Sequence, residues 1–166
     1  MIEEPTKEEI KLLFERLATA PRRFFELCSG AAPERLALPL APGKWTALQI
    51  LRHLTGCDRE ALLPRIEKIL AESDPFLPNW DQDQWMKQYG DVRNVRAVQL
   101  LDEWARLREK IALTLFDLSL EQWARTGRHE RRGTLTLFQL CRLNADHDDL
   151  HWRQISHRLT PDSALN

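Results

Sequence analysis

Four long segments with helical periodicity dominate this sequence and restrict it to a helical fold. In each of them, apolar residues recur every three or four positions, the spacing that gathers side chains on one face of an α-helix. The clearest apolar stripe consists of Leu100, Trp104, Leu107, Ile111, Leu115 and Leu118. No stretch alternates apolar and polar residues over several positions, so no β-strand is expected. The pattern therefore predicts an all-α protein built as a four-helix bundle.

Capping boxes indicate where the helices begin. In this motif a Ser or Thr and a Glu or Gln three residues later each bond a backbone N–H that the first helical turn leaves unpaired. The sequence contains four such pairs: Thr6 with Glu9, Thr46 with Gln49, Ser119 with Gln122, and Thr136 with Gln139. We therefore expect long helices over residues 7–27, 47–71, 95–118 and 137–159, and a short helical turn after Ser119.

Two prolines fall inside the predicted helices. Because proline has no backbone N–H and its ring clashes with the preceding turn, we expect a kink or restart near Ala20, before Pro21, and a bend at Pro64.

An aromatic-rich loop separates the second and third predicted helices, over residues 73–94. It carries Phe76, Trp80, Trp85 and Tyr89 among polar residues and prolines. These side chains either plug one end of the bundle or form a lid or a subunit contact, because buried aromatic residues anchor such interfaces. The sequence leaves both alternatives open.

Composition and charge exclude several classes of protein. A length of 166 residues suits one domain, spanning residues 1–166, and 43% apolar with 30% charged residues is typical of a globular protein. The net charge of −1, with both signs interspersed, does not favour nucleic-acid binding. No apolar run approaches the ~20 residues of a membrane span. Three cysteines and an acidic N-terminus without a signal-peptide pattern favour a cytoplasmic location.

The pair His147 and His151 carries the strongest chemical signal. Their i, i+4 spacing places both rings on one helix face, about 6 Å apart along the axis. They continue the stripe of Leu140 and Ile155, which should face the core. A buried imidazole needs partners for both nitrogens, and a shared metal ion would provide one. His53, on the second amphipathic helix, is the candidate third ligand.

Other interpretations of the histidines and of Cys57 stay open at this point. A His-x3-His pair also occurs by chance, and the rings could pack and bond without a metal. Cys57 could approach the same centre or act as a nucleophile beside His53, although a free buried cysteine is the more common state. His129, in a polar loop, and His157, off the shared face, are expected to be solvated or locally hydrogen-bonded.

Nearby charged residues have candidate roles as well. Asp58, Glu60 or Asp146 could orient a metal ligand, although most such carboxylates are solvated surface charges. The cluster of Arg128, Arg131 and Arg132 could bind an anionic substrate, but a loop of mixed charge is usually surface.

Two motifs together resemble those of the DinB-like family of metal-binding helical bundles. The first, KWTALQILRHL, runs from Lys44 to Leu54, and the second, HDDLHWRQI, runs from His147 to Ile155 after a GTLTL segment. The resemblance covers nearly the whole chain, residues 6–159. Gln49 stands where many relatives have Glu, which leaves the capping box intact.

This resemblance implies an up-down-down-up bundle, often dimeric, in which three histidines hold one divalent ion, most often zinc or nickel. The ligands carry over to His53, His147 and His151. The family includes the bacillithiol-transferase and mycothiol-dependent isomerase branches, and many members have no known reaction. We therefore also expect a homodimer.

Three neutral imidazoles leave at least one coordination position open for a substrate or a nucleophile. Such a site can activate water or a thiol, so we expect a metal-dependent hydrolase or thiol-dependent transferase that acts on a small molecule, with a low-molecular-weight thiol as a candidate cofactor. The alternative is a non-catalytic bundle, stapled by its metal, that serves as a stress-related or interaction protein.

Overall fold

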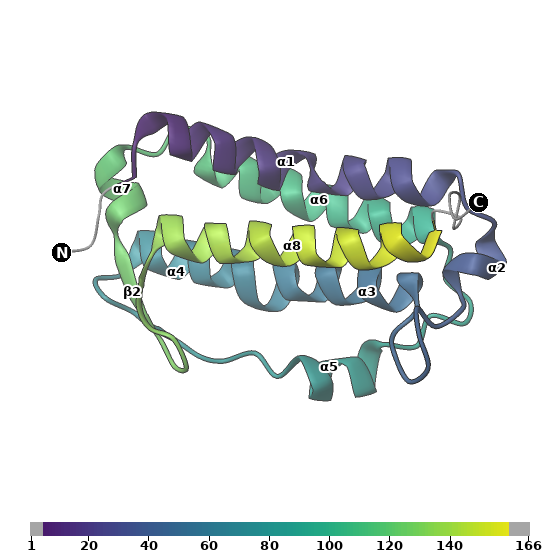
Figure 1. Cartoon of the computed structure of the whole chain (residues 1–166). Coiled ribbons are helices and arrows are strands. Elements are labelled where there is room, and N and C mark those ends of the chain that lie inside the picture. The colour runs from purple at the N-terminus through teal and green to yellow at the C-terminus, as the bar shows by residue number, and fades with distance from the viewer. Residues whose placement is uncertain (1–4, 160–166) are drawn as a thin grey trace.

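The computed structural model describes residues 5–159 and shows the predicted four-helix bundle (Figure 1). Its long helices are α1 (Lys7–Ser29), α3 (Ala47–Cys57) continued by the π-helical turn η1 (Asp58–Leu62) and α4 (Leu63–Ala71), α6 (Ala97–Leu115) and α8 (Leu137–Leu159). The ends of the predicted domain, residues 1–4 and 160–166, lie outside the described part, as does most of the acidic N-terminus. None of the helices in residues 5–159 combines the length and apolar character of a membrane span.

The direction of the helices confirms the up-down-down-up topology. α1 and α8 run one way, while α3–α4 and α6 run the other (Figure 1). Since α4 and α6 run in the same direction, α4 ends at one end of the bundle and α6 begins at the other. The connection over residues 72–96 therefore returns along the length of the bundle. A helix of 25 residues spans roughly 37 Å, so this return is long. It contains the short helix α5 (Gln82–Tyr89) and lies along one side of the bundle instead of plugging an end.

All four predicted capping boxes are present. In each, the hydroxyl accepts from the backbone N–H three residues on, and the Glu or Gln side chain accepts from the N-cap backbone N–H; they open α1, α3, α7 (Leu120–Ala124) and α8. α8 has the predicted bounds. α6 is shorter than predicted, because Arg96 takes the N-cap position and Leu115 is its last helical residue.

The structure shows how the helices accommodate the two prolines. α1 continues through the buried Pro21, so the predicted restart near Ala20 is wrong; the apolar packing of this face outweighs the roughly 3 kcal/mol cost of an interior proline. Before Pro64, the N–H of Leu63 donates to the carbonyl of Asp58, five residues earlier. This π-helical turn starts a new helical register, so Pro64 falls in a first turn, where its missing N–H matters little.

A small sheet corrects the expectation that the chain has no strands. β1 (Phe76–Leu77) pairs in parallel with β2 (Thr126–His129), which pairs antiparallel with β3 (Gly133–Thr136). Gly133, at φ 74°, lies in the left-handed region that closes the hairpin turn. Strands of two to four residues are too short to show an alternating pattern, so no signal for them was present in the sequence. The hairpin lies at the end of the bundle where α4 ends and α8 begins (Figure 1).

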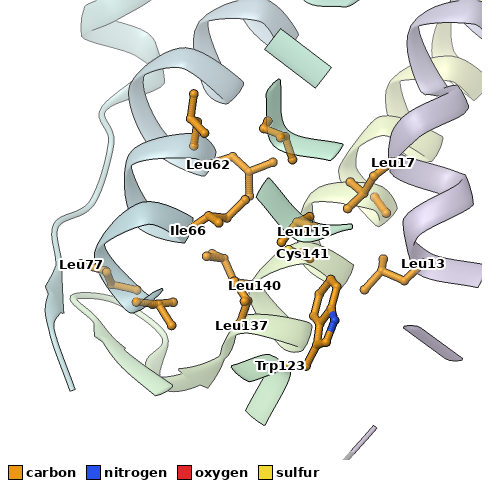
Figure 2. Close-up of a cluster of buried hydrophobic side chains, with 14 residues drawn as sticks. Leu13, Leu17, Leu62, Ile66, Leu77, Leu115, Trp123, Leu137, Leu140 and Cys141 are labelled. Carbon is orange, nitrogen blue, oxygen red and sulfur yellow. The ribbon is translucent and has the colours of Figure 1, made fainter. Parts of the chain in front are cut away.

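The apolar interior is divided into two clusters along the bundle. Figure 2 shows the first, to which α1, η1, α4, α6 and α8 contribute side chains together with Trp123 of α7. Its labelled members are Leu13, Leu17, Leu62, Ile66, Leu77, Leu115, Trp123, Leu137, Leu140 and Cys141. The second cluster, toward the other end, includes Phe24 and Trp104, whose rings meet edge to face at 5.1 Å. Each long helix contributes to both clusters.

A buried charged cluster joins all four long helices between the two apolar regions. Arg108 of α6 pairs through its Nε and Nη2 with the carboxylate of Asp58 in η1, and its Nη1 lies 2.8 Å from Asp148 of α8. The same Nη1 donates to the carbonyl of Leu17 in α1 at 3.0 Å. Trp104 Nε1 donates to Asp58 at 2.7 Å. Water is excluded, because Arg108, Asp58 and Asp148 are each no more than 2% exposed.

Removing Arg108 should therefore destabilise the bundle severely. An Arg108→Met variant leaves two buried carboxylates without a counter-charge, and we expect its free energy of unfolding to fall by about 3–5 kcal/mol. Urea denaturation measures this loss. The matched control is Arg106→Met on the exposed face of the same helix, where the change should stay within about 0.5 kcal/mol. Equal losses in the two variants would contradict the role of Arg108 as the counter-charge of the two buried carboxylates.

Candidate metal centre

Three histidine rings converge in the middle of the bundle. His53 lies on α3, and His147 and His151 lie one turn apart on α8. The Nε2 atom of His147 is 3.0 Å from Nε2 of His53 and 3.0 Å from Nε2 of His151. Among residues 5–159 these three form the one group of possible metal-binding side chains, with ligand atoms all within 4.8 Å of one another. The structure thus brings together the three histidines singled out in the sequence.

The spacing of these nitrogens fits a tetrahedral transition metal. With metal–nitrogen bonds of 2.0–2.1 Å, two imidazole nitrogens in a tetrahedral site lie about 3.3 Å apart. The two 3.0 Å separations are close to this value, so small side-chain movements would accommodate an ion. Two adjacent Nε2–Nε2 contacts are also difficult to satisfy with protons alone, because a neutral imidazole has one N–H to donate.

Burial keeps the three rings neutral. Burial is the main cause that lowers the pKa of His53 to about 3 and that of His147 to about 4; the charges of neighbouring histidines, and of Arg108 in the case of His147, contribute the rest. Burial also lowers the pKa of His151, against the opposing effect of its bond to Gln154. At neutral pH each ring therefore keeps a lone pair, which is the form that binds a metal.

The neighbours of each ring fix its orientation. Nδ1 of His151 lies 2.8 Å from Oε1 of Gln154, an oxygen that can only accept, so the proton belongs on Nδ1 and the lone pair of Nε2 faces the centre. His53 lies between Trp45, at 5.0 Å, and Trp80, which stacks on it at 5.7 Å between ring centroids. Sequence reasoning did not single out Gln154, although its position three residues after His151 on one helix was an available signal.

The carboxylates that could have oriented the ligands have other roles. Asp58 binds Arg108 and Trp104, Glu60 is exposed, and Asp146 pairs with Arg16 on the surface. Among the described residues, none of them has a hydrogen bond to a histidine of the cluster. Asp58 and Asp148 act on the site indirectly, because they hold η1 and the α8 residue next to His147 in place.

Cys57 lines the cavity next to the histidines but is not a member of their cluster. Burial raises the pKa of its thiol to about 12, and the charges of Asp58 and Asp148 add to the effect. A thiol that stays protonated is a poor nucleophile and a poor ligand. The structure therefore supports the interpretation of Cys57 as a free cysteine, with a half-buried side chain.

The remaining two histidines lie away from the cluster. His157 is exposed on the last turns of α8. His129 is buried in β2, not in the loop where the sequence placed it, and its Nδ1 accepts from the backbone N–H of Arg131 at 3.2 Å. The expectation of a local hydrogen bond is thus confirmed for His129, while the expectation of an irregular loop is wrong.

The return connection covers the site through its tryptophans. Trp80 stacks on His53, and Trp85 of α5 packs against Trp80 at 5.6 Å and against Gly56 of α3. A Cβ atom on Gly56 would lie 2.4 Å from the indole of Trp85, so glycine is needed for this close approach. Gly56 therefore makes room for the covering segment.

A cavity of about 240 Å³ opens beside the histidines. His53, His147 and Trp80 line one part of it, and α4, α8 and the β2–β3 hairpin provide the rest. The cluster is therefore accessible to a small molecule.

Comparison with known proteins places the chain in a family. A model described as the DinB superfamily matches residues 16–155, so this protein belongs to the DinB superfamily. A protein of Oceanobacillus iheyensis is 22% identical over 163 residues, which cover 98% of this chain and 92% of that protein. The structure of YfiT from Bacillus subtilis superimposes with a TM-score of 0.85 at 21% identity, covering 95% of this chain and 90% of YfiT. Both relatives are described as probable metal-dependent hydrolases, and YfiT is described as having an unusual four-helix bundle topology.

The lowered pKa of His53 predicts a specific pH dependence of stability. In the unfolded chain this ring titrates near 6.5, and in the folded chain near 3. Below pH 6.5 the unfolded state therefore takes up a proton that the folded state does not. The free energy of unfolding consequently decreases as the pH is lowered. Metal-free wild type should lose stability relative to His53→Gln by up to about 1.4 kcal/mol per pH unit between pH 6 and 4. Urea denaturation measures the free energy of unfolding of both proteins at each pH. The same pH dependence in wild type and in His53→Gln would contradict this prediction.

Gly56→Ala should displace the covering segment. The added methyl group forces the indole of Trp85 away from α3, so we expect faster amide hydrogen exchange throughout α5. Gly30→Ala is the control, because nothing lies within 4 Å of its Cβ position. If exchange in α5 is the same in both variants, Trp85 does not hold the segment in place.

Proposed function

We propose that this protein is a divalent-metal-dependent hydrolase of a small molecule, with His53, His147 and His151 as the metal ligands. One observation carries the proposal: three neutral imidazole nitrogens from two helices converge within 4.8 Å of one another, and two of these rings, His53 and His147, line a cavity. The description of both relatives as probable metal-dependent hydrolases supports it.

A divalent ion in such a site polarises a carbonyl or phosphoryl group and lowers the pKa of a coordinated nucleophile. The protein supplies the conditions for this chemistry. Burial keeps the rings deprotonated, and Gln154 aims Nε2 of His151 at the centre. Trp45 and Trp80 limit the access of bulk water to His53.

Zinc and nickel, the ions that the family resemblance implies, both suit an imidazole site. The described residues offer three ligands, and a closed structural site usually has four. Together with the adjacent cavity, this favours a catalytic site over the alternative of a non-catalytic metal staple.

A thiol-dependent transferase is the second candidate. A second cavity, of about 500 Å³, reaches His151 from the side of Trp45 and Lys44. Two cavities on one histidine cluster suit a reaction between two substrates, one of them a low-molecular-weight thiol. That thiol would come from solution, because burial keeps Cys57 protonated.

We also propose that the protein is a cytoplasmic homodimer that does not bind nucleic acid or membranes. Three free cysteines support a reducing compartment. Leu113 and Phe116, which are 74% and 75% exposed on α6 and just beyond it, support a subunit contact. Analytical ultracentrifugation of the wild type and of Phe116→Ser tests the dimer.

Metal content provides the direct test of the ligands. Protein purified without an affinity tag should contain about one divalent ion per chain by elemental analysis. His147→Ala removes the nitrogen shared by both 3.0 Å contacts and should lose the ion, whereas His157→Ala should retain it. Equal metal content in the two variants would contradict the proposed ligand set.

Activity separates the two candidate reactions. We expect metal-loaded protein to hydrolyse members of a panel of esters, amides and lactones without a thiol, and metal-free protein and His53→Ala to be inactive. Turnover of electrophiles that requires added thiol would instead assign the transferase. A metal-loaded protein with four protein ligands and no exchangeable position would overturn both.

A further inference from the structure

The cavity beside the histidines continues along α3, η1 and α4 to a pair of arginines. His53, Cys57, Ala61 and Arg65 follow one another at intervals of four residues, and all four line the cavity. Arg65 therefore lies roughly three helical turns from His53. Arg132, in the turn of the β2–β3 hairpin, lines the same cavity.

These two arginines lack acidic partners within the part of the chain that the structure describes, residues 5–159. Arg65 is half-buried and donates from Nη2 to the carbonyl of Pro78 at 2.6 Å, which leaves its charge uncompensated. Burial lowers the pKa of Arg65, and the nearby charge of Arg132 lowers it further. No carboxylate lines the cavity, so its charge is positive even before a metal binds.

Other arginines near the hairpin do not line the cavity. Arg128 pairs with Asp74 at 3.0 Å, and Arg125 donates to the carbonyls of Ile69 and Glu72. The carboxylate of Glu130 accepts from the backbone N–H of Asn79 at 2.7 Å. Arg125 and Arg131 also have no acidic partner among residues 5–159, but neither lines the cavity, so Arg65 and Arg132 are the cations that face it.

His129 adds a hydrogen-bond donor to the same region. Its Nδ1 accepts from the backbone N–H of Arg131, so the proton of the neutral ring is on Nε2. Burial first, and then the charges of Arg65 and Arg132, lower its pKa and keep the ring neutral. His129 also lines the cavity.

We propose that Arg65 and Arg132 form a subsite for an oxyanion of the substrate, a carboxylate or a phosphate, at the end of the cavity away from the histidine cluster. The inference rests on the proposed function, because it takes the cavity beside the metal ligands as the substrate site. Guanidinium groups bind these anions through paired, charge-assisted hydrogen bonds.

The wall between the two ends defines the rest of the substrate. Leu62 of η1, Leu135 of β3, and Leu140 and Leu143 of α8 line the cavity and offer no hydrogen bonds. The substrate class is therefore a small acid with a hydrolysable group at one end, an apolar middle part and an anionic group at the other end.

Binding of two matched probes to metal-loaded protein tests this subsite. The first series is alkyl hydroxamates, which bind the metal; the second has the same chain lengths and a terminal carboxylate. We expect the carboxylate to raise the affinity, measured by calorimetry, at the chain length that reaches the arginines. Arg65→Gln and Arg132→Gln should each remove roughly ten- to hundredfold of this affinity and leave that of the neutral hydroxamate within twofold.

Matched controls separate a local effect from a loss of fold or of general charge. Arg128→Gln removes the same charge from the hairpin, outside the cavity, and should change neither affinity. Arg132 is exposed and lies in a turn, so Arg132→Gln keeps the fold and decides the question should Arg65→Gln fail to fold. A carboxylate that adds no affinity, or an equal loss in Arg128→Gln, overturns the subsite.

A metal-free experiment distinguishes failure of this inference from failure of the proposed function. Hexanoate and hexyl phosphate should bind saturably to metal-free wild type, as measured by quenching of tryptophan fluorescence, and not to Arg132→Gln. Binding here without any hydroxamate binding would overturn the metal site and support the subsite. Hydroxamate binding with no arginine-dependent anion binding would support the metal site and overturn the subsite. The stronger of the two anions identifies the natural group as carboxylate or phosphate.

Discussion

The guanidinium of Arg108 is the interaction on which the arrangement of the bundle depends. It contacts Asp58, Asp148 and the carbonyl of Leu17, and so connects α6 to the other three long helices in a region without water. Buried ions of this kind are costly unless their geometry is complete, so the helices are held at one mutual position. His53 lies five residues before Asp58, and His147 immediately precedes Asp148. The charged cluster therefore also fixes the histidines relative to one another.

Topology explains why this site is covered and why it has a cavity. Because two parallel helices follow each other in the chain, the connection over residues 72–96 must return along the bundle (Figure 1), and its Trp80 stacks on His53 of α3. Trp80 and Trp85 cover His53 from this segment, and the β2–β3 hairpin adds the second wall. The resulting space has histidine nitrogens at one end and uncompensated arginines at the other, which suits an anionic substrate.

Particular residues show how far the sequence could be interpreted. The capping boxes gave the starts of α1, α3, α7 and α8, because capping is local chemistry. The histidines of α8 were recognisable because two polar residues interrupt an apolar stripe. Arg108 likewise interrupts the apolar stripe of α6, four residues after Trp104 and three before Ile111, so its unusual position could be recognised in the sequence. The buried ion pairs of Arg108 could not be predicted, however, because a charged helical residue is interpreted as solvent-exposed until its partners on other helices are known.

The sequence by itself determined the four helices, the bundle class and the identity of the three histidines, because periodicity, capping and residue chemistry act over a few neighbouring positions. The tertiary structure alone decided that the rings meet within bonding reach of a shared ion, that Arg65 and Arg132 line the same cavity, and that the short strands form. These features join residues up to a hundred positions apart. Their distances depend on how whole helices pack, which no local pattern encodes.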